Sequence, residues 1–186
     1  MITIVSGLPR SGTSVMMQVL KAGGMHVLTD ELRKADENNP RGYYEYEKVK
    51  ALMKDNSWLA EAEGKTVKVI AQLIPNLPLE HQYNVIFMER SIDEILLSQN
   101  KMIDKLGGKK PLIDPAILKK TFEGQLQKVK SYLAEKDNFT TIFIDHRDLL
   151  YNTKATVENV NNTLNLNLNI ENAVTAVDTT LHRNKV

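Results

Sequence analysis

Residues 7–14, with the sequence GLPRSGTS, gather several groups that can donate hydrogen bonds to an anion. Arg10 carries a fork of N–H donors that fits phosphate or sulfate oxygens, and hydroxyl donors follow it at Ser11, Thr13 and Ser14. A short apolar run precedes the segment and apolar residues at helical spacing follow it, so we expect a turn between a strand and a helix. In such a turn the backbone N–H groups and the helix N-terminus point at the same spot. The segment therefore predicts a binding site for a phosphate or sulfate group.

The spacing of the two glycines in this segment matches the P-loop pattern G-x-x-x-x-G-K-[ST], with one departure. Thr13 stands where the pattern has the Lys that neutralises the β- and γ-phosphates of a nucleoside triphosphate. This departure argues against an ordinary kinase or ATPase, and Arg10, three positions earlier, supplies the positive charge instead. A tight strand-to-helix turn without any ligand is the alternative interpretation.

The segment LPRSGTS resembles the 5′-phosphosulfate loop of the PAPS-dependent sulfotransferases, whose usual form is P-[KR]-S-G-T-[TS]. That family also places an Arg at the end of a strand and a Ser eight residues later, a spacing that Arg90 and Ser98 share. Eight residues are just over two helical turns, so both side chains can face one ligand. The resemblance implies PAPS, or its product PAP, as the cofactor. It places the 3′-phosphate at Arg90 and Ser98 and the 5′ end in the loop, at Pro9, Arg10, Ser11, Gly12, Thr13 and Ser14.

Other segments also resemble small bacterial members of this superfamily, so the resemblance covers nearly the whole chain. They are NNPRGYYEYE, GKTVKVI and FIDHRDLLYN. Two features of the family are missing. The glycine-rich Arg-Lys-Gly loop that clamps the 3′-phosphate in many members is absent, and the C-terminus offers only Arg183 or Lys185 instead. The His that many members use as a base is absent after the strand that carries Lys68.

Sulfuryl transfer needs charge stabilisation at the leaving oxygen and a base for the proton of the acceptor. We expect Arg10 to stabilise the leaving oxygen and Lys68 to contact the transferred group. Three carboxylates are candidate bases: Asp30, Glu31 and Glu45. Asp30 and Glu31 fall where the similar tyrosylprotein sulfotransferases have a Glu pair that contains the base, and Glu31 is the formal match. For each of the three, a solvated surface carboxylate is an equal alternative, and Asp30 has the further alternative of a helix N-cap.

Short apolar runs alternate with amphipathic segments along the chain. We expect strands at residues 2–6, 66–70, 84–88 and 140–144, and helices at residues 12–22, 45–54, 91–105, 115–136 and 154–164. This alternation predicts an α/β fold, a three-layer P-loop-type sandwich around a mostly parallel sheet of about four or five strands. The segment 107–115, rich in Gly and Pro, is a candidate mobile loop.

The chain has 186 residues, 42% of them hydrophobic, which suits a single domain over residues 1–186. A net charge of +1 with scattered basic residues predicts neither nucleic-acid nor membrane-surface binding. The chain has no cysteine, and its four His residues are dispersed, so we expect no metal site. There is no signal-peptide pattern and no apolar run near the roughly 20 residues that cross a bilayer. We therefore expect a cytoplasmic protein.

The hypothesis from the sequence is a PAPS-dependent sulfotransferase that acts on a small-molecule or glycan-type acceptor. Two alternatives remain open. A Mg-dependent P-loop phosphotransferase or hydrolase would place its metal at Ser14 and at Asp145, the acidic end of the strand IFID. A non-catalytic nucleotide-binding module would keep the loop and lack acceptor chemistry. Neither the acceptor nor the oligomeric state is predicted by the sequence.

Overall fold

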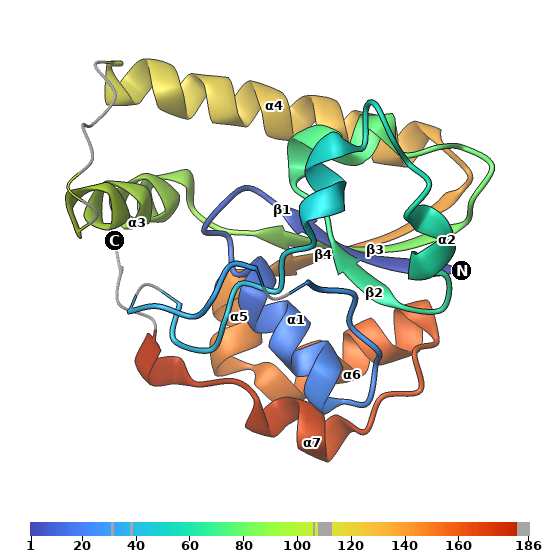
Figure 1. The fold of residues 1–186 in the computed structure, drawn as a ribbon. Coiled ribbons are helices and arrows are strands. Elements are labelled where there is room, and N and C mark those ends of the chain that lie inside the picture. Colours follow the sequence, from blue (N-terminus) through green and yellow to red (C-terminus); the bar gives the residue numbers. More distant parts are fainter. Residues whose placement is uncertain (31, 38, 106, 108–112, 182–186) are drawn as a thin grey trace.

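A four-stranded, all-parallel sheet forms the middle layer of the molecule (Figure 1). In this computed structural model, residues 1–30, 32–37, 39–105, 107 and 113–181 are described. The strands are β1 (Ile2–Gly7), β2 (Thr66–Lys68), β3 (Tyr83–Glu89) and β4 (Phe139–Asp145), in the order β2-β1-β3-β4. Each pair is parallel, so all carboxyl ends meet at one edge of the sheet. The predicted α/β class and the parallel sheet are confirmed, with four strands among the described residues.

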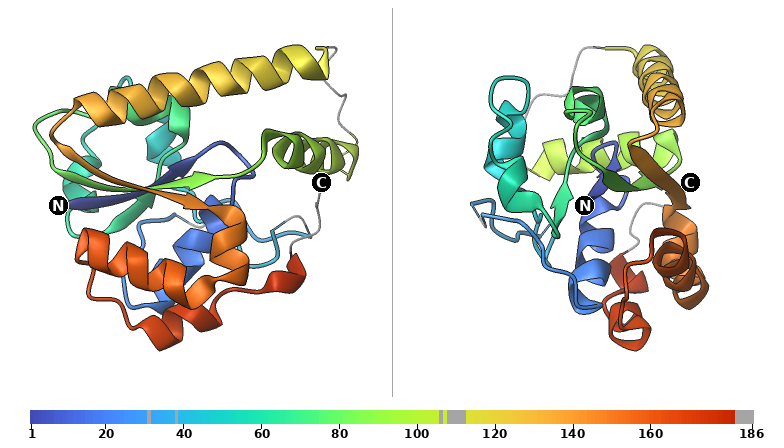
Figure 2. Two further views of the ribbon diagram at one scale, coloured as in Figure 1. Left: turned by 180° about the vertical axis from the view of Figure 1, so that it is seen from behind. Right: turned by 90° about the vertical axis from the view of Figure 1, so that its right-hand side faces the viewer.

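Helices cover both faces of this sheet, as the two views in Figure 2 show. One face carries α1 (Thr13–Ala22), α6 (Thr153–Leu164) and α7 (Ile170–Thr175). The other face carries α4 (Pro115–Glu135) and the short helices η1 (Glu47–Ala51), α2 (Leu59–Ala62) and η2 (Ala71–Asn76). Helix α3 (Ile92–Lys105) leaves the carboxyl end of β3, and α5 (His146–Tyr151) leads from β4 to α6. A last short helix is η3 (Thr179–Leu181).

The two central strands, β1 and β3, are apolar on both faces because each face packs against its own core. Ile4 and Phe87 face the core under α4, whereas Val5 and Ile86 face the core under α1 and α6. All four side chains are fully buried, which explains why the strands read as continuous apolar runs instead of an alternating pattern. The three layers fix the carboxyl edge of the sheet as a rigid base for the loops that follow β1, β3 and β4.

Several elements differ from the sequence prediction. The helix expected at residues 45–54 is the short 3-10 helix η1, and α2, η2 and α7 were not predicted. Pro75 lies inside η2, where a proline would normally argue against a helix, and α7 is too short to show a clear period. Most of the candidate mobile loop at residues 107–115 lies outside the described residues. Within the described part of the chain, no helix has both the length and the apolar character to cross a bilayer.

Candidate functional site

The loop after β1 begins with a tight turn at residues 8–11. The amide of Ser11 donates a 3.1 Å hydrogen bond to the carbonyl oxygen of Leu8, which closes the turn. Pro9 occupies the second position of this turn, and Arg10 has a φ of 75° at the third. This is the pattern of a type II turn, whose third position usually requires glycine. An Arg held at positive φ is strained, and such strain is found preferentially at functional sites.

The two glycines of the loop are required by close packing. A Cβ on Gly7 would come within 2.6 Å of the carbonyl oxygen of Met88, the residue beside it on β3. A Cβ on Gly12 would lie 2.5 Å from Cδ2 of His146, at the start of α5. Both glycines also have positive φ, 145° and 100°. The loop is therefore pressed against the ends of β3 and β4, which explains the G-x-x-x-x-G spacing in this chain.

The two predicted motifs meet in one place. Nε of Arg10 donates a 2.9 Å hydrogen bond to Oγ of Ser98, although the two residues are 88 positions apart. Nη1 of Arg90 donates to the backbone carbonyl oxygen of Arg10 at 3.0 Å. Arg10, Arg90 and Ser98 thus form one continuous cluster at the carboxyl edge of the sheet. This proximity supports the expectation that the loop and the Arg90–Ser98 motif share one ligand.

A buried carboxylate that the sequence analysis did not single out completes this cluster. Glu94 is 0% exposed, and its Oε2 accepts a 2.9 Å hydrogen bond from Nε of Arg90. Its Oε1 accepts from Nε of Arg147 at 3.1 Å and from Nη2 of the same guanidinium. These three residues line a cavity of about 360 Å³ together with Ser91 and Asp145. No sequence signal distinguished Glu94 from a surface acid, because a Glu in the first turn of a helix is ordinary.

A second cluster surrounds the start of α1. Lys68, at the carboxyl end of β2, donates to the carbonyl oxygen of Tyr43, and its Nζ lies 3.5 Å from Oγ of Ser14. Ser14 Oγ also donates to Tyr43 O at 3.3 Å. Glu45 places Oε1 3.6 Å from Lys68 Nζ and 2.8 Å from Nη1 of Arg33. The predicted base candidate Glu45 and the predicted contact residue Lys68 therefore lie beside the loop.

Positive charge is concentrated around the loop. Burial lowers the pKa of Lys68 to about 8, and the guanidiniums of Arg33 and Arg10 lower it too, while Glu45 raises it. Burial also lowers the pKa of the Arg10 guanidinium, and the charges of Arg90 and Arg33 act in the same direction. Arg10 stays protonated at neutral pH because the ordinary pKa of a guanidinium is so high. A bound anion would relieve this mutual repulsion.

The other candidate bases lie in different settings. Asp30 accepts hydrogen bonds from the backbone amides of Leu32, at 3.1 Å, and Glu47, at 2.5 Å. Glu47 is the first residue of η1, but the N-cap residue of that helix is Tyr46, so the N-cap alternative for Asp30 is not confirmed. Glu31 lies outside the described residues. Of the three carboxylates, Glu45 is the one with a contact that reaches the loop cluster in the described structure.

The remaining predicted positions are accounted for as follows. Asp145 Oδ1 accepts a 2.7 Å hydrogen bond from the amide of Arg147 and caps α5. Arg183 and Lys185 lie outside the described residues. Ser11 is 1% exposed, and its Oγ has no hydrogen-bond partner among the described residues. This hydroxyl oxygen is buried within the loop, close to Gly7.

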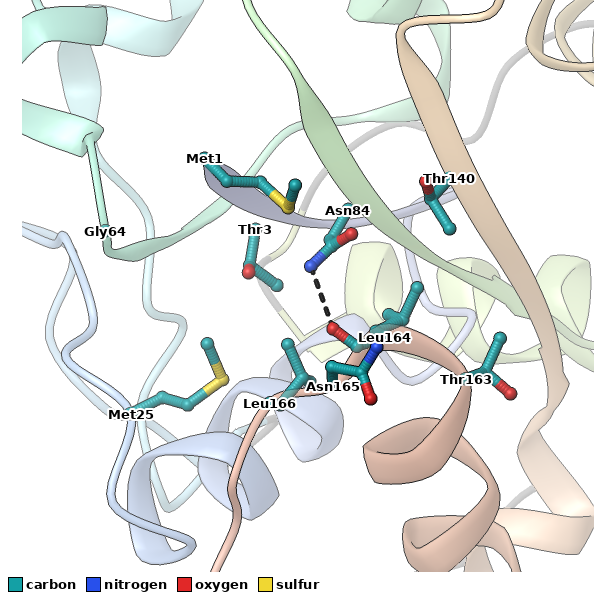
Figure 3. Close-up of a pocket in the computed structure, with 10 residues that line it drawn as sticks. All are labelled: Met1, Thr3, Met25, Gly64, Asn84, Thr140, Thr163, Leu164, Asn165 and Leu166. Carbon is teal, nitrogen blue, oxygen red and sulfur yellow. Dashed lines mark hydrogen bonds between the residues drawn. The ribbon is translucent and has the colours of Figure 1, made fainter.

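A larger cavity lies at the opposite, amino edge of the sheet (Figure 3). Its volume is about 450 Å³, and its wall includes Thr3, Asn84, Thr140 and Thr163. The side-chain amide of Asn84 lies in this wall, and its Nδ2 donates a 3.2 Å hydrogen bond to the carbonyl oxygen of Leu164. The side chains that line it are neutral, and Met1, whose N-terminal ammonium pairs with Glu63, is part of its wall. Among the described residues, none of the site residues predicted from the sequence lines this cavity.

Comparison of the chain with family models, with curated proteins and with solved structures finds no match in any of the three. The assignment of a function therefore depends on the residues of the site itself.

Proposed function

We propose that this protein is a PAPS-dependent sulfotransferase that transfers a sulfuryl group to a hydroxyl or amine of a small-molecule or glycan-type acceptor. The observation that carries the proposal is the 2.9 Å hydrogen bond from Arg10 to Ser98. It joins the two motifs that resemble the 5′-phosphosulfate loop and the 3′-phosphate motif of that family. Segments that follow neighbouring parallel strands meet at this edge in any case, and the hydrogen bond supports the proposal because it brings the two motifs within reach of one ligand.

The residues at this edge fit a ligand with anions at both ends. The amides of the loop and the charges of Arg10 and Lys68 suit the 5′ end. Arg90 and Ser98 suit the 3′-phosphate, and the contact of Arg90 Nη1 with Arg10 O keeps the two groups adjacent. A cofactor that carries several negative charges would offset the repulsion among these cations.

When bound, PAPS would supply a sulfuryl group whose bond from sulfur to the 5′-phosphate oxygen breaks as sulfur bonds to the acceptor, leaving a sulfated acceptor and 3′,5′-ADP. Arg10 is placed to stabilise negative charge on the leaving oxygen. Glu45 is our candidate for the base that takes the proton of the acceptor, because its Oε1 lies beside the loop, 3.6 Å from Nζ of Lys68 and 2.8 Å from Nη1 of Arg33. Lys68 holds a positive charge next to this carboxylate and next to the first turn of α1.

Calorimetric titration with 3′,5′-ADP, and separately with ATP and Mg²⁺, tests the proposal. We expect the wild-type protein to bind 3′,5′-ADP and to bind ATP with Mg²⁺ far more weakly. Arg10→Ala removes a charged hydrogen-bond donor and is expected to weaken 3′,5′-ADP binding roughly 10- to 100-fold. Lys48→Gln is the control, since Lys48 is a half-exposed cation paired with Glu61 at 2.7 Å and is not among the residues that line the cavity.

Strong binding of ATP with Mg²⁺ and no binding of 3′,5′-ADP would favour the phosphotransferase alternative and reject the sulfotransferase. Binding of 3′,5′-ADP without release of 3′,5′-ADP from PAPS, across a panel of hydroxyl and amine acceptors, would favour the non-catalytic module.

A further inference from the structure

The backbone carbonyl oxygen of Tyr43 is bonded to two donors that an anion at the loop of residues 7–14 would need. It accepts a hydrogen bond from Nζ of Lys68 and a second one, at 3.3 Å, from Oγ of Ser14. Nζ of Lys68 also lies 3.5 Å from Oγ of Ser14, so the three groups meet at the first turn of α1. Because the Lys68 side chain is 9% exposed, its ammonium depends on protein partners, and this carbonyl is one of them.

The peptide that carries this carbonyl is held in an unfavourable conformation. Tyr44, the residue that follows it, has a φ of 54°. A bulky residue rarely adopts positive φ, because its Cβ crowds the backbone, and it does so only where the surroundings hold it there. A rotation of the peptide unit between Tyr43 and Tyr44 by about 180° would return Tyr44 to negative φ. The conformation that turns the Tyr43 carbonyl toward Lys68 therefore carries a backbone cost that the rotated peptide avoids.

The chain on both sides of this peptide is anchored by other contacts. Before it, Nη1 of Arg41 donates to the carbonyl oxygen of Ala176 at 2.6 Å. After it, the carbonyl oxygen of Glu45 accepts a 2.9 Å hydrogen bond from Oγ1 of Thr29. Neither contact involves the peptide itself. Rotation of this one peptide unit therefore requires no release of the flanking chain from these anchors.

Rotation would replace an acceptor by a donor. In a trans peptide the C=O and the N–H point in opposite directions, so the rotated unit turns the N–H of Tyr44 toward Ser14 and Lys68. An ammonium, a hydroxyl and an N–H would then converge on one point. Such a group of donors around a buried ammonium is favourable only with an anion among them. An empty site therefore favours the inward carbonyl, and a bound sulfate or phosphate favours the inward N–H.

We propose that the peptide between Tyr43 and Tyr44 is a switch that responds to an anion at the loop. Without ligand, the Tyr43 carbonyl satisfies Lys68 and Ser14. With a sulfate, a phosphate or the sulfuryl end of the cofactor in place, the N–H of Tyr44 becomes a further donor to the anion. This inference rests on the proposed function, because it describes the same anion site. The competing explanation is a fixed carbonyl that holds Lys68 in position in both states.

The test compares substitutions of Tyr44 that differ in their tolerance of positive φ. Tyr44→Ala and Tyr44→Gly both remove the ring, but only glycine adopts positive φ without cost. Glycine therefore favours the inward carbonyl, and calorimetry should show that inorganic sulfate and 3′,5′-ADP bind about fivefold more weakly to Tyr44→Gly than to Tyr44→Ala. Tyr44→Asn tolerates positive φ better than Tyr44→Ala, so its affinity should lie between the two. This variant keeps the comparison usable if the glycine variant fails to fold.

Asn167 provides a matched control. Its φ is 56°, it is exposed, and it lies between α6 and α7. This connection contacts the opposite end of α1 from the loop, where the amide of Asn169 donates to the carbonyl oxygen of Gly23 at 2.9 Å. Asn167→Ala and Asn167→Gly should therefore bind each ligand with equal affinity.

Equal affinities of Tyr44→Ala and Tyr44→Gly, or tighter binding by the glycine variant, would overturn the switch, because the Tyr43 carbonyl would then face inward in the bound protein as well. A wild-type protein that binds inorganic sulfate but not 3′,5′-ADP would reject the proposed function, and the sulfate series would still decide on the switch. Binding of neither ligand by the wild-type protein would reject both.

Discussion

The two edges of the sheet each carry a cavity, and they differ in chemistry more than in size. The amino edge has the larger one, about 450 Å³, lined by neutral side chains such as Thr3 and Asn84. The carboxyl edge has a cavity of about 360 Å³ whose wall includes Arg90, Glu94 and Arg147. Parallel strands bring every following loop to the carboxyl edge, so charged side chains from distant parts of the chain converge there. The comparison shows that the two edges differ in charged groups, because the cavity at the carboxyl edge holds two guanidiniums balanced by Glu94 and Asp145.

The largest expected effect concerns the buried acid at the carboxyl edge. Glu94→Gln leaves two guanidiniums without their carboxylate, one of them 8% exposed, and should lower the free energy of unfolding by about 3 kcal/mol. At the amino edge, Asn84→Ala removes a neutral buried hydrogen bond and should lower it by about 1 to 2 kcal/mol. Urea denaturation of both variants measures the difference. Equal losses, or a larger loss at the amino edge, would contradict an electrostatic distinction between the edges.

The next effect concerns pH. The pKa of Lys68 is lowered to about 8 in the free protein, and an anion beside it would raise that pKa again. Ligand binding therefore takes up a proton above pH 8, so affinity for 3′,5′-ADP is full below pH 8 and declines as pH rises through it. We expect a loss of about fivefold between pH 7 and pH 9, measured by calorimetry. The Lys68→Met variant should bind 3′,5′-ADP more weakly than the wild-type protein at pH 7, and its affinity should not decline between pH 7 and pH 9. A wild-type affinity that is constant over this range would argue against a role for Lys68.

The smallest expected effect concerns backbone strain. Arg10 and Asn165 both have positive φ, 75° at the anion loop and 50° at the wall of the amino-edge cavity. Arg10→Gly should raise the free energy of unfolding by up to about 1 kcal/mol while it weakens 3′,5′-ADP binding. Asn165→Gly should raise the free energy of unfolding by less, because Asn tolerates this conformation. This variant should leave the affinity for 3′,5′-ADP unchanged. Thermal unfolding of both variants tests this. A loss of stability in Arg10→Gly would show that the Arg10 contacts, rather than its strain, dominate.

The sequence predicted the elements that depend on local patterns. The four strands and the helix after the loop were expected because buried parallel strands are continuous apolar runs and α1 has apolar residues at helical spacing. The sequence assigned Arg10 and Ser98 to two ends of one ligand, whereas their direct hydrogen bond and the adjacency of β1 and β3 come from the structure. The strand and helix patterns require no knowledge of how distant side chains pack.

What the sequence missed depends on contacts between distant segments. Glu94 is ordinary for the first turn of a helix, and only the fold shows that it is buried between Arg90 and Arg147. Asp30 and Glu45 were equal candidates in the sequence. The structure separates them, because Asp30 contacts the amide of Glu47 whereas Glu45 approaches Lys68. Neither contact leaves a local signature in the sequence.

A crystal structure of the complex with 3′,5′-ADP tests the central claim most directly. We predict that the 5′-phosphate lies against the amides of residues 7–14 and that the 3′-phosphate lies against Arg90 and Ser98. A 5′-phosphate bound elsewhere, for example in the cavity at the amino edge, would contradict the account, as would a loop whose amides turn away from the nucleotide.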